Sequence, residues 1–287
     1  MHKFIITTDT TCDLPQEYLL QHNLSLLPLY YSFNGTVYGD KKDLKPKEFY
    51  DMMRGGVMPT TMAVNPDTAR EVFTKLLDEG NDILHIGFST GLSGSCSVAA
   101  TTARELCEEK SGAKITVVDS LCASLGEGLL IHKAVELKEN GKSLDEITDW
   151  LEKNKLNLCH IFTVDDLHHL HRGGRVSKAT AIIGTLINVK PVLHVDNDGH
   201  LIPLENIRGR KKSLVALVDN MEKRISGYKN DTVFISHGDC AEDAQYVASL
   251  VQERFGVCNI LINYVSPTIG AHSGPGTVAL FFMGNPR

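Results

Sequence analysis

The sequence predicts an α/β protein with two domains, a mainly parallel sheet in the first and an α+β arrangement in the second. The first observation is that short apolar runs alternate with helical segments from residue 3 to residue 154, which implies a parallel sheet covered on both faces. The second is that hairpin-like strands replace this alternation after residue 158. The third is the length of 287 residues, which suits two domains, and we place them at residues 1–160 and 161–287.

The first half is expected to begin with a buried strand over residues 3–9 and a hairpin after it. Asn34-Gly35 suits the tight primed turn of that hairpin. Asn65 can cap the next long helix, with Pro66 in its first turn, and Ser143 can cap a later one. The other expected strands are 24–33, 36–38, 82–88 and 114–119, and the expected helices are 47–54, 66–77, 95–110, 123–138 and 144–154.

The second half is expected to hold more strands than helices. Asn197-Asp-Gly199 predicts the turn of a hairpin between strands 189–196 and 200–204. The segment 267–276, rich in glycine and proline, is expected to be a shaped loop. The remaining expected strands are 158–164, 232–237, 259–265 and 277–283, and the expected helices are 211–224 and 241–255.

Charge and composition exclude several classes of protein. The net charge of −6 and the pI of about 6.0 disfavour nucleic-acid binding, because phosphate contacts need concentrated lysine and arginine. One basic run, Arg208-Gly-Arg-Lys-Lys212, departs from this balance. No stretch approaches the roughly 18 apolar residues that a membrane helix needs, and the N-terminal residues are too polar for a signal peptide. We therefore expect a cytoplasmic protein whose scattered cysteines are reduced.

Three polar segments at the ends of predicted strands or the starts of helices could bind an anion. Ser89-Thr-Gly-Leu-Ser-Gly94 lies between a strand and a helix, where tight turns and free helix N–H groups suit a carboxylate or phosphate. Pro59-Thr-Thr61 supplies two hydroxyl groups, and His272 can donate a hydrogen bond or move a proton near neutral pH. Each segment also has a structural interpretation, as a cap, a turn or a connection.

A fourth segment, His171-Arg-Gly-Gly-Arg175, places a guanidinium group after two glycines. Arginine is the preferred fork for a carboxylate or phosphate, although a solvated turn explains the pattern equally well. The nearby His168 and His169 do not have the spacing of common zinc sites, and a surface helix accounts for them. We therefore expect no metal and no cofactor.

A serine hydrolase is the main competing interpretation. Gly87-Phe-Ser89-Thr-Gly91 fits the Gly-x-Ser-x-Gly pattern between a predicted strand and a predicted helix, and Asp239 and His272 follow in the expected order. The helix is expected to start about four residues later than a nucleophile elbow requires. Short patterns with two glycines also recur by chance.

A set of segments spread over the whole chain points to one family. These segments lie at residues 8–15, 59–61, 89–94, 118–120, 162–170, 172–175, 208–212 and 270–276. Together they resemble the DegV family, which includes the FakB fatty-acid-binding subunits of bacterial fatty acid kinase. The resemblance implies two α/β domains, with an acyl chain in a tunnel of the N-terminal domain and its carboxylate at the domain interface.

The resemblance also implies roles for particular residues. Thr61 and Ser93 would hydrogen-bond the carboxylate of a long-chain fatty acid, His272 would join that network, and Arg175 would lie near the exposed head group. The chain would then be a carrier and not an enzyme, since a separate ATP-dependent kinase subunit would phosphorylate the bound fatty acid. Neither nucleic acid nor an integral membrane segment is implied, and contact with a membrane would be transient.

The basic run would dock the kinase subunit through Arg208, Arg210 and Lys211, with a solvated basic face as the alternative. The sequence departs from the commoner family pattern at Met62-Ala-Val-Asn65 and at Ser95-Cys-Ser-Val98. These departures leave the hydroxyl groups at positions 61 and 93 in place. They keep open a third interpretation, a binding module for another amphiphilic carboxylate without a kinase.

Overall fold

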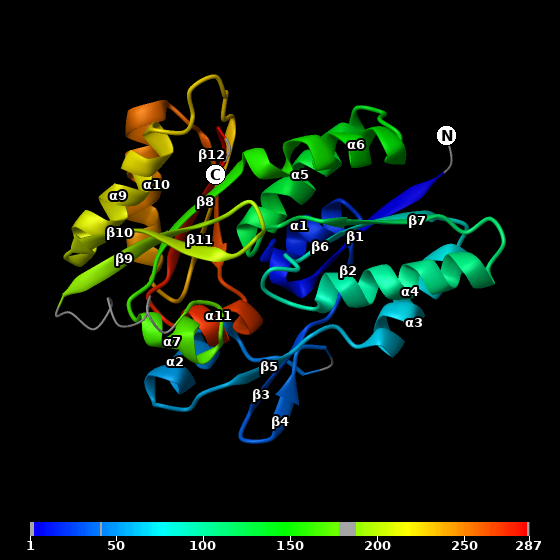
Figure 1. The fold of residues 1–287 in the computed structure, drawn as a ribbon, viewed down its shortest axis with the longest axis horizontal. Helices are drawn as coiled ribbons and strands as arrows, with labels where there is room; N and C mark the ends of the chain where they lie inside the picture. The colour runs from blue at the N-terminus through cyan, green and yellow to red at the C-terminus, as the bar shows by residue number, and fades with distance from the viewer. Residues whose placement is uncertain (1–2, 41, 178–187, 286) are drawn as a thin grey trace.

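The computed structural model describes residues 3–40, 42–177, 188–285 and 287. Its first sheet has four parallel strands in the order β2-β1-β6-β7, formed by β1 (Phe4–Asp9), β2 (Ser25–Leu27), β6 (Asp82–Gly87) and β7 (Ile115–Asp119). Helices α3 (Pro66–Asp78) and α4 (Ser95–Glu109) pack together and against this sheet (Figure 1). The side chain of Asn65 caps α3 as expected, by accepting a hydrogen bond from the amide of Asp67.

The second sheet has six strands of mixed direction in the order β10-β9-β8-β13-β11-β12. Its strands are β8 (Leu158–Thr163), β9 (Val189–Val195), β10 (Leu201–Arg208), β11 (Thr232–His237), β12 (Asn259–Tyr264) and β13 (Val278–Met283). Helices α9 (Arg210–Glu222) and α10 (Ala241–Phe255) pack against it (Figure 1). The fold class predicted from the sequence, a parallel sheet followed by an α+β part, is therefore confirmed.

Helix α5 (Leu125–Glu139) joins the two sheets. Its residues from Leu125 to Ile131 are all buried, which is typical of a helix that is covered on every side. It contacts β6 of the first sheet and β8, β11 and β13 of the second. One apolar core thus runs from Ile86 through Leu129 to Phe281. Residue 160 lies inside β8, so a domain boundary there stays an approximate prediction.

A small antiparallel sheet lies beside this core, in the order β4-β3-β5. It consists of β3 (Tyr30–Phe33), β4 (Thr36–Tyr38) and β5 (Thr60–Met62), and α2 (Pro46–Arg54) and α11 (Pro267–Ser273) lie next to it (Figure 1). The remaining elements are η1 (Thr10–Cys12), α1 (Gln16–Gln21), α6 (Leu144–Asn154), η2 (Lys155–Asn157) and α7 (Leu167–Arg172). Every helix of the described residues is too short or too polar to cross a membrane.

Two local predictions were wrong, and one strand was not expected from the sequence. The expected strand 24–33 is two strands in different sheets, because Pro28 interrupts it and cannot donate a ladder hydrogen bond. The segment at Thr61 is strand β5, which pairs with β3. The expected loop 267–276 begins as helix α11, since Pro267 suits a first helical turn and Gly274, with a φ of 79°, ends it.

Candidate functional site

A cavity of about 180 Å³ lies between the two sheets. Its lining is mostly apolar and includes Phe88 and Leu92 from the first half and Phe162, Val195 and Phe281 from the second. Strands of the second sheet thus form part of the cavity wall. The tunnel for the acyl chain inside residues 1–160 stays a prediction. All four predicted ligand-binding residues line this cavity: Thr61, Ser93, Arg175 and His272.

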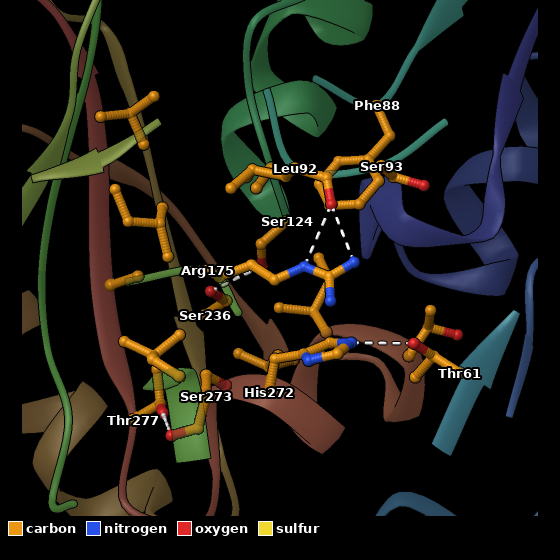
Figure 2. Close-up of a pocket in the computed structure, with 18 of the residues that line it drawn as sticks. Thr61, Phe88, Leu92, Ser93, Ser124, Arg175, Ser236, His272, Ser273 and Thr277 are labelled. Carbon is orange, nitrogen blue, oxygen red and sulfur yellow. Dashed lines mark hydrogen bonds between the residues drawn. The ribbon is translucent and has the colours of Figure 1, made fainter. Parts of the chain in front are cut away.

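The structure brings Thr61 and His272 into direct contact. Thr61 Oγ1, on β5, lies 2.8 Å from Nε2 of His272 in the last turn of α11 (Figure 2). The imidazole packs against Gly173, where a side chain would overlap Nδ1 of the ring. Burial, and then the charges of Arg175 and Arg172, lower the pKa of His272 to about 4. The imidazole is therefore neutral near pH 7, and a negative charge in the cavity would favour its protonation.

Ser93 lies on the loop that leads into α4. Its Oγ is 2.9 Å from the Oγ of Ser95 and accepts a hydrogen bond of 3.2 Å from the Ser95 amide. Gly94 is the N-cap of this 15-residue helix, and no side chain caps it. The positive end of the helix dipole thus opens on the same cavity as Ser93, which favours an anionic group there.

Arg175 crosses the space between the two halves. Its Nε and Nη2 both donate to the carbonyl of Leu92, at 3.1 and 3.0 Å (Figure 2). Its Nη1 donates to the carbonyl of Gly173. No acidic side chain among the described residues pairs with it. Burial lowers the pKa of its guanidinium, although an arginine stays charged near neutral pH. The cavity therefore holds a positive charge that lacks a protein counter-ion in the described part of the chain.

The predicted docking residues differ in their surroundings. Arg208, at the end of β10, is exposed, and Lys211 is exposed with its Nζ 5.2 Å from the ring centre of Tyr246. Arg210 turns inward, because its Nε donates to Asp243 at 2.8 Å and its Nη1 lies 3.6 Å from Asp165. Two of the three side chains are thus available at the surface, and the third is committed to ion pairs.

The geometry does not support the hydrolase interpretation. Ser89 is fully buried, and its hydroxyl donates to the carbonyl of Gly199 at 3.0 Å in the turn between β9 and β10. Asp239 pairs with Arg54 of α2. His272 hydrogen-bonds Thr61, so no described histidine is a hydrogen-bond partner of Ser89. The Ser89 hydroxyl instead links the β6–α4 loop to the second half of the chain through this hydrogen bond.

The sequence interpretation missed a second polar group in the cavity wall. Ser124 and Ser236 line the cavity with their Oγ atoms 2.9 Å apart (Figure 2). The Ser124 hydroxyl also donates to the carboxylate of Asp13. Burial raises the pKa of Asp13 to about 7. Ser124 has a φ of 56° and a ψ of −146°, a conformation that costs a non-glycine residue on the order of 1–3 kcal/mol. Asp13 lies in the segment 8–15 quoted above, but its spacing gives no sign of Ser236.

Comparisons with known proteins agree with this architecture. The family model described as "Uncharacterised protein, DegV family" matches residues 3–285. A DegV domain-containing protein of Clostridium perfringens is 43% identical over 289 residues, covering 100% of this chain and 99% of its own length.

Two solved structures share the fold. One, described as fatty acid binding of a DegV family protein from Thermus thermophilus, has a TM-score of 0.88 and 29% identity, and covers 99% of this chain and 100% of its own. Another, described as a stearic acid-binding protein from Eubacterium ventriosum, has a TM-score of 0.91 and 25% identity, and covers 98% of each chain. The family match over almost the whole length decides the assignment: this chain belongs to the DegV family.

Proposed function

We propose that this protein binds a long-chain fatty acid in the cavity between its two sheets and carries it without itself catalysing a reaction. The observation that carries the proposal is the cavity, whose apolar lining ends at the hydrogen-bonded pair of Thr61 and His272. Solved relatives are described as binding fatty acids, one of them stearic acid. An amphiphile with an apolar tail and one anionic head matches both parts of this cavity.

The head group is assigned to the polar end of the cavity. Thr61 and Ser93 supply hydroxyl donors, the start of α4 supplies a favourable dipole, and His272 supplies a ring N–H. Arg175 supplies the positive charge that balances the carboxylate. Burial of a carboxylate without such partners would cost several kcal/mol. These groups therefore fix the orientation of the ligand and prevent a large loss of affinity.

The tail supplies most of the affinity. Burial of one methylene group contributes about 0.8 kcal/mol, so a chain of roughly 15 gives on the order of 10 kcal/mol before the costs of association. An affinity that comes mainly from the tail suits a carrier. The apolar tail needs protection from water, whereas the head group must remain within reach of another protein.

We assign the chemistry to a partner. A separate ATP-dependent kinase subunit would phosphorylate the presented carboxylate, and this chain would carry fatty acid to it and acyl-phosphate from it. The exposed Arg208 and Lys211 are suited to an acidic or phosphate-bearing surface. A carrier of another amphiphilic carboxylate, without a kinase, is the alternative that the same cavity would serve.

Native mass spectrometry of the purified protein tests the proposal. The expected result is a protein mass increased by that of a fatty acid, released on denaturation and identified by its own mass. Protein that is empty and does not take up fatty acids between 14 and 20 carbons would contradict the proposal. A fluorophosphonate probe tests the hydrolase separately, and we expect no labelling because Ser89 is buried.

A further inference from the structure

The lining residues of the second sheet show where the cavity ends. At the start of β13 and along it they are Thr277, Ala279 and Phe281. Alternate residues of a strand face the same side, so each of the three lies about 7 Å further from α11 than the one before it. The next residue on that face, Met283, does not line the cavity. The cavity therefore ends at the level of Phe281.

The neighbouring strand β8 ends the cavity at the same level. It runs antiparallel to β13, with Phe162 opposite Ala279 and His160 opposite Phe281. Phe162 and His160 both line the cavity, whereas Leu158, the next residue on this face, does not. The imidazole of His160 and the ring of Phe281 thus form the row of this wall that is farthest from α11, the helix that carries the head-group histidine.

The imidazole of His160 is held in place on several sides. The residue is 2% exposed, and the amide of Ala123 donates to its Nε2 at 3.4 Å. Its ring meets that of Phe281 edge to face, with the ring centres 5.3 Å apart. On the side of α5, a Cβ at Gly126 would lie 2.2 Å from Nε2, so only a glycine fits there. A side chain packed in this way cannot swing aside for a longer ligand.

The imidazole is also uncharged. Burial, and then the charge of Arg287, lowers the pKa of His160 well below its usual value. The ring is therefore neutral near pH 7, and its Nε2 lone pair already accepts the Ala123 amide. A neutral ring whose acceptor is satisfied can face a methyl group without the cost of burying a charge.

We propose that His160 and Phe281 form the end wall for the acyl tail, and that the imidazole of His160 sets the longest chain that the cavity accepts. The tail then runs from the head-group site along the second sheet and ends against this wall. This inference rests on the proposed fatty-acid binding and adds to it the residue that selects chain length.

The test measures the affinity of delipidated protein for saturated fatty acids from about 12 to about 22 carbons, by competition with a fluorescent fatty acid. Each added methylene group that is buried should raise the affinity about fourfold, the factor that corresponds to ~0.8 kcal/mol. The rise should stop at a limiting length, where the tail reaches the end wall. A wild type whose affinity rises over the whole series would overturn the inference.

The variant His160→Ala moves the wall. It removes the imidazole and leaves space that about two further methylene groups can fill, so the limiting length should increase by about two carbons. His194→Ala is the matched control, because His194 pairs with Ile161 on the other face of the sheet and does not line the cavity. Its limiting length should equal that of the wild type. A His160→Ala protein that binds fatty acids with the wild-type limit would overturn the inference.

The variant Val195→Phe makes the opposite change. Val195 follows His194 in β9, so it lies beside His160 on the cavity side, where it lines the wall. The larger ring occupies part of the space for the tail, and the limiting length should decrease by about two carbons. An unchanged limit would place the tail elsewhere, such as within the first half of the chain alone, and would contradict the inference.

A measurement on the wild type decides the question even if circular dichroism shows that the variants do not fold. In the complex with the acid of limiting length, the terminal methyl group should give nuclear Overhauser effects to the ring protons of His160. Their absence would overturn the end wall alone. Failure of every acid in the series to bind would overturn the proposed function as well.

Discussion

Gly173 packs against the imidazole of His272 so closely that a Cβ at position 173 would overlap Nδ1 of the ring. Gly173 ends helix α7, and His272 lies in the last turn of α11, so the contact joins segments on either side of the 178–187 gap in the described chain. Because position 173 has no side chain, the ring can lie where its Nε2 contacts Thr61.

We predict that Gly173→Ala displaces the imidazole and weakens fatty-acid binding by about tenfold, the loss of one well-placed hydrogen bond to a charged group. Titration calorimetry of delipidated protein measures the fatty-acid affinity. Gly174→Ala is the control, because its φ of 73° makes alanine strained there but no atom lies within 4 Å of the added Cβ. Equal losses in both variants would attribute the effect to helix α7 instead of the imidazole.

Thr61→Val removes the hydroxyl but keeps the shape of the side chain. Because Oγ1 is the hydrogen-bond partner of His272 and an assigned donor to the carboxylate, we expect a loss of affinity of about 1–2 kcal/mol. Thr61→Ser retains the hydroxyl and should retain most of the affinity. A competition assay with a fluorescent fatty acid distinguishes them. If valine and serine behaved alike, the hydroxyl at position 61 would have no part in binding.

The protonation of His272 should depend on the ligand. Without a ligand its pKa is about 4, lowered first by burial and then by Arg175 and Arg172. A bound carboxylate favours the imidazolium and raises this pKa, so binding should take up protons between pH 4 and the new value, and affinity should rise as pH falls through that range. Calorimetry at pH 5 in buffers of different ionisation enthalpy counts the protons. His272→Gln should abolish the uptake, and uptake that persists in this variant would refute the assignment.

Asp13 should make stability depend on pH in the opposite direction from an ordinary carboxylate. Burial raises its pKa from 3.8 to about 7, so its contribution is fully present below pH 4 and is lost as pH rises through 7. The shift corresponds to about 4 kcal/mol. The titratable groups that face it are those of Asp9, Cys12, Tyr50 and Glu127.

We therefore expect Asp13→Asn to be more stable than the wild type at pH 8 and similar to it at pH 5. The Oδ1 of an asparagine can still accept from the Ser266 amide. Its Nδ2 can donate to the Ser124 hydroxyl, which in the wild type donates to Asp13. Thermal unfolding at the two pH values gives the comparison, and the neighbouring acids cancel because both proteins contain them. A wild type that was the more stable protein at pH 8 would contradict the prediction.

The order of strands and helices could be predicted because apolar periodicity reports burial directly. Helix α3 was identified from Asn65 and Pro66, whose capping roles are local. Helix α11 was missed, because its glycines at positions 270 and 274 indicated a loop. Gly270 is required instead by the close approach of Tyr50, a residue 220 positions earlier that no local rule connects to it.

The residues of the site also include some that the sequence indicates and others that only the structure reveals. Thr61, Ser93, Arg175 and His272 lie in distinctive polar segments, and the fold brings these segments to one cavity. Ser124 and Ser236 lie at ordinary positions at a helix start and in a strand, and they meet only because α5 packs against β11. Pairing between distant elements depends on tertiary packing, so only the structure could reveal the second polar group.

The basic residues 208–212 give the last prediction, which separates docking from stability. Arg210 binds Asp243 and lies near Asp165 with only 22% of its side chain exposed. Arg210→Ala leaves Asp243 without its ion-pair partner and should cost about 2 kcal/mol of stability. Arg208 is exposed, and its side chain has no hydrogen bond or ion pair with any described residue. Arg208→Glu should therefore leave the melting temperature within experimental error of the wild type.

With a kinase subunit present, Arg208→Glu should impair the reaction although it does not lower the stability of the protein. Arg208→Glu puts a negative charge on the proposed docking surface, so we expect slower acyl-phosphate formation, by about tenfold at low salt, with fatty-acid affinity retained. Raising the ionic strength should narrow the difference, because exposed charges are screened. Radiolabelled ATP follows the reaction. A kinase that turned over Arg208→Glu and the wild type at the same rate at low salt would move the docking surface away from this basic run.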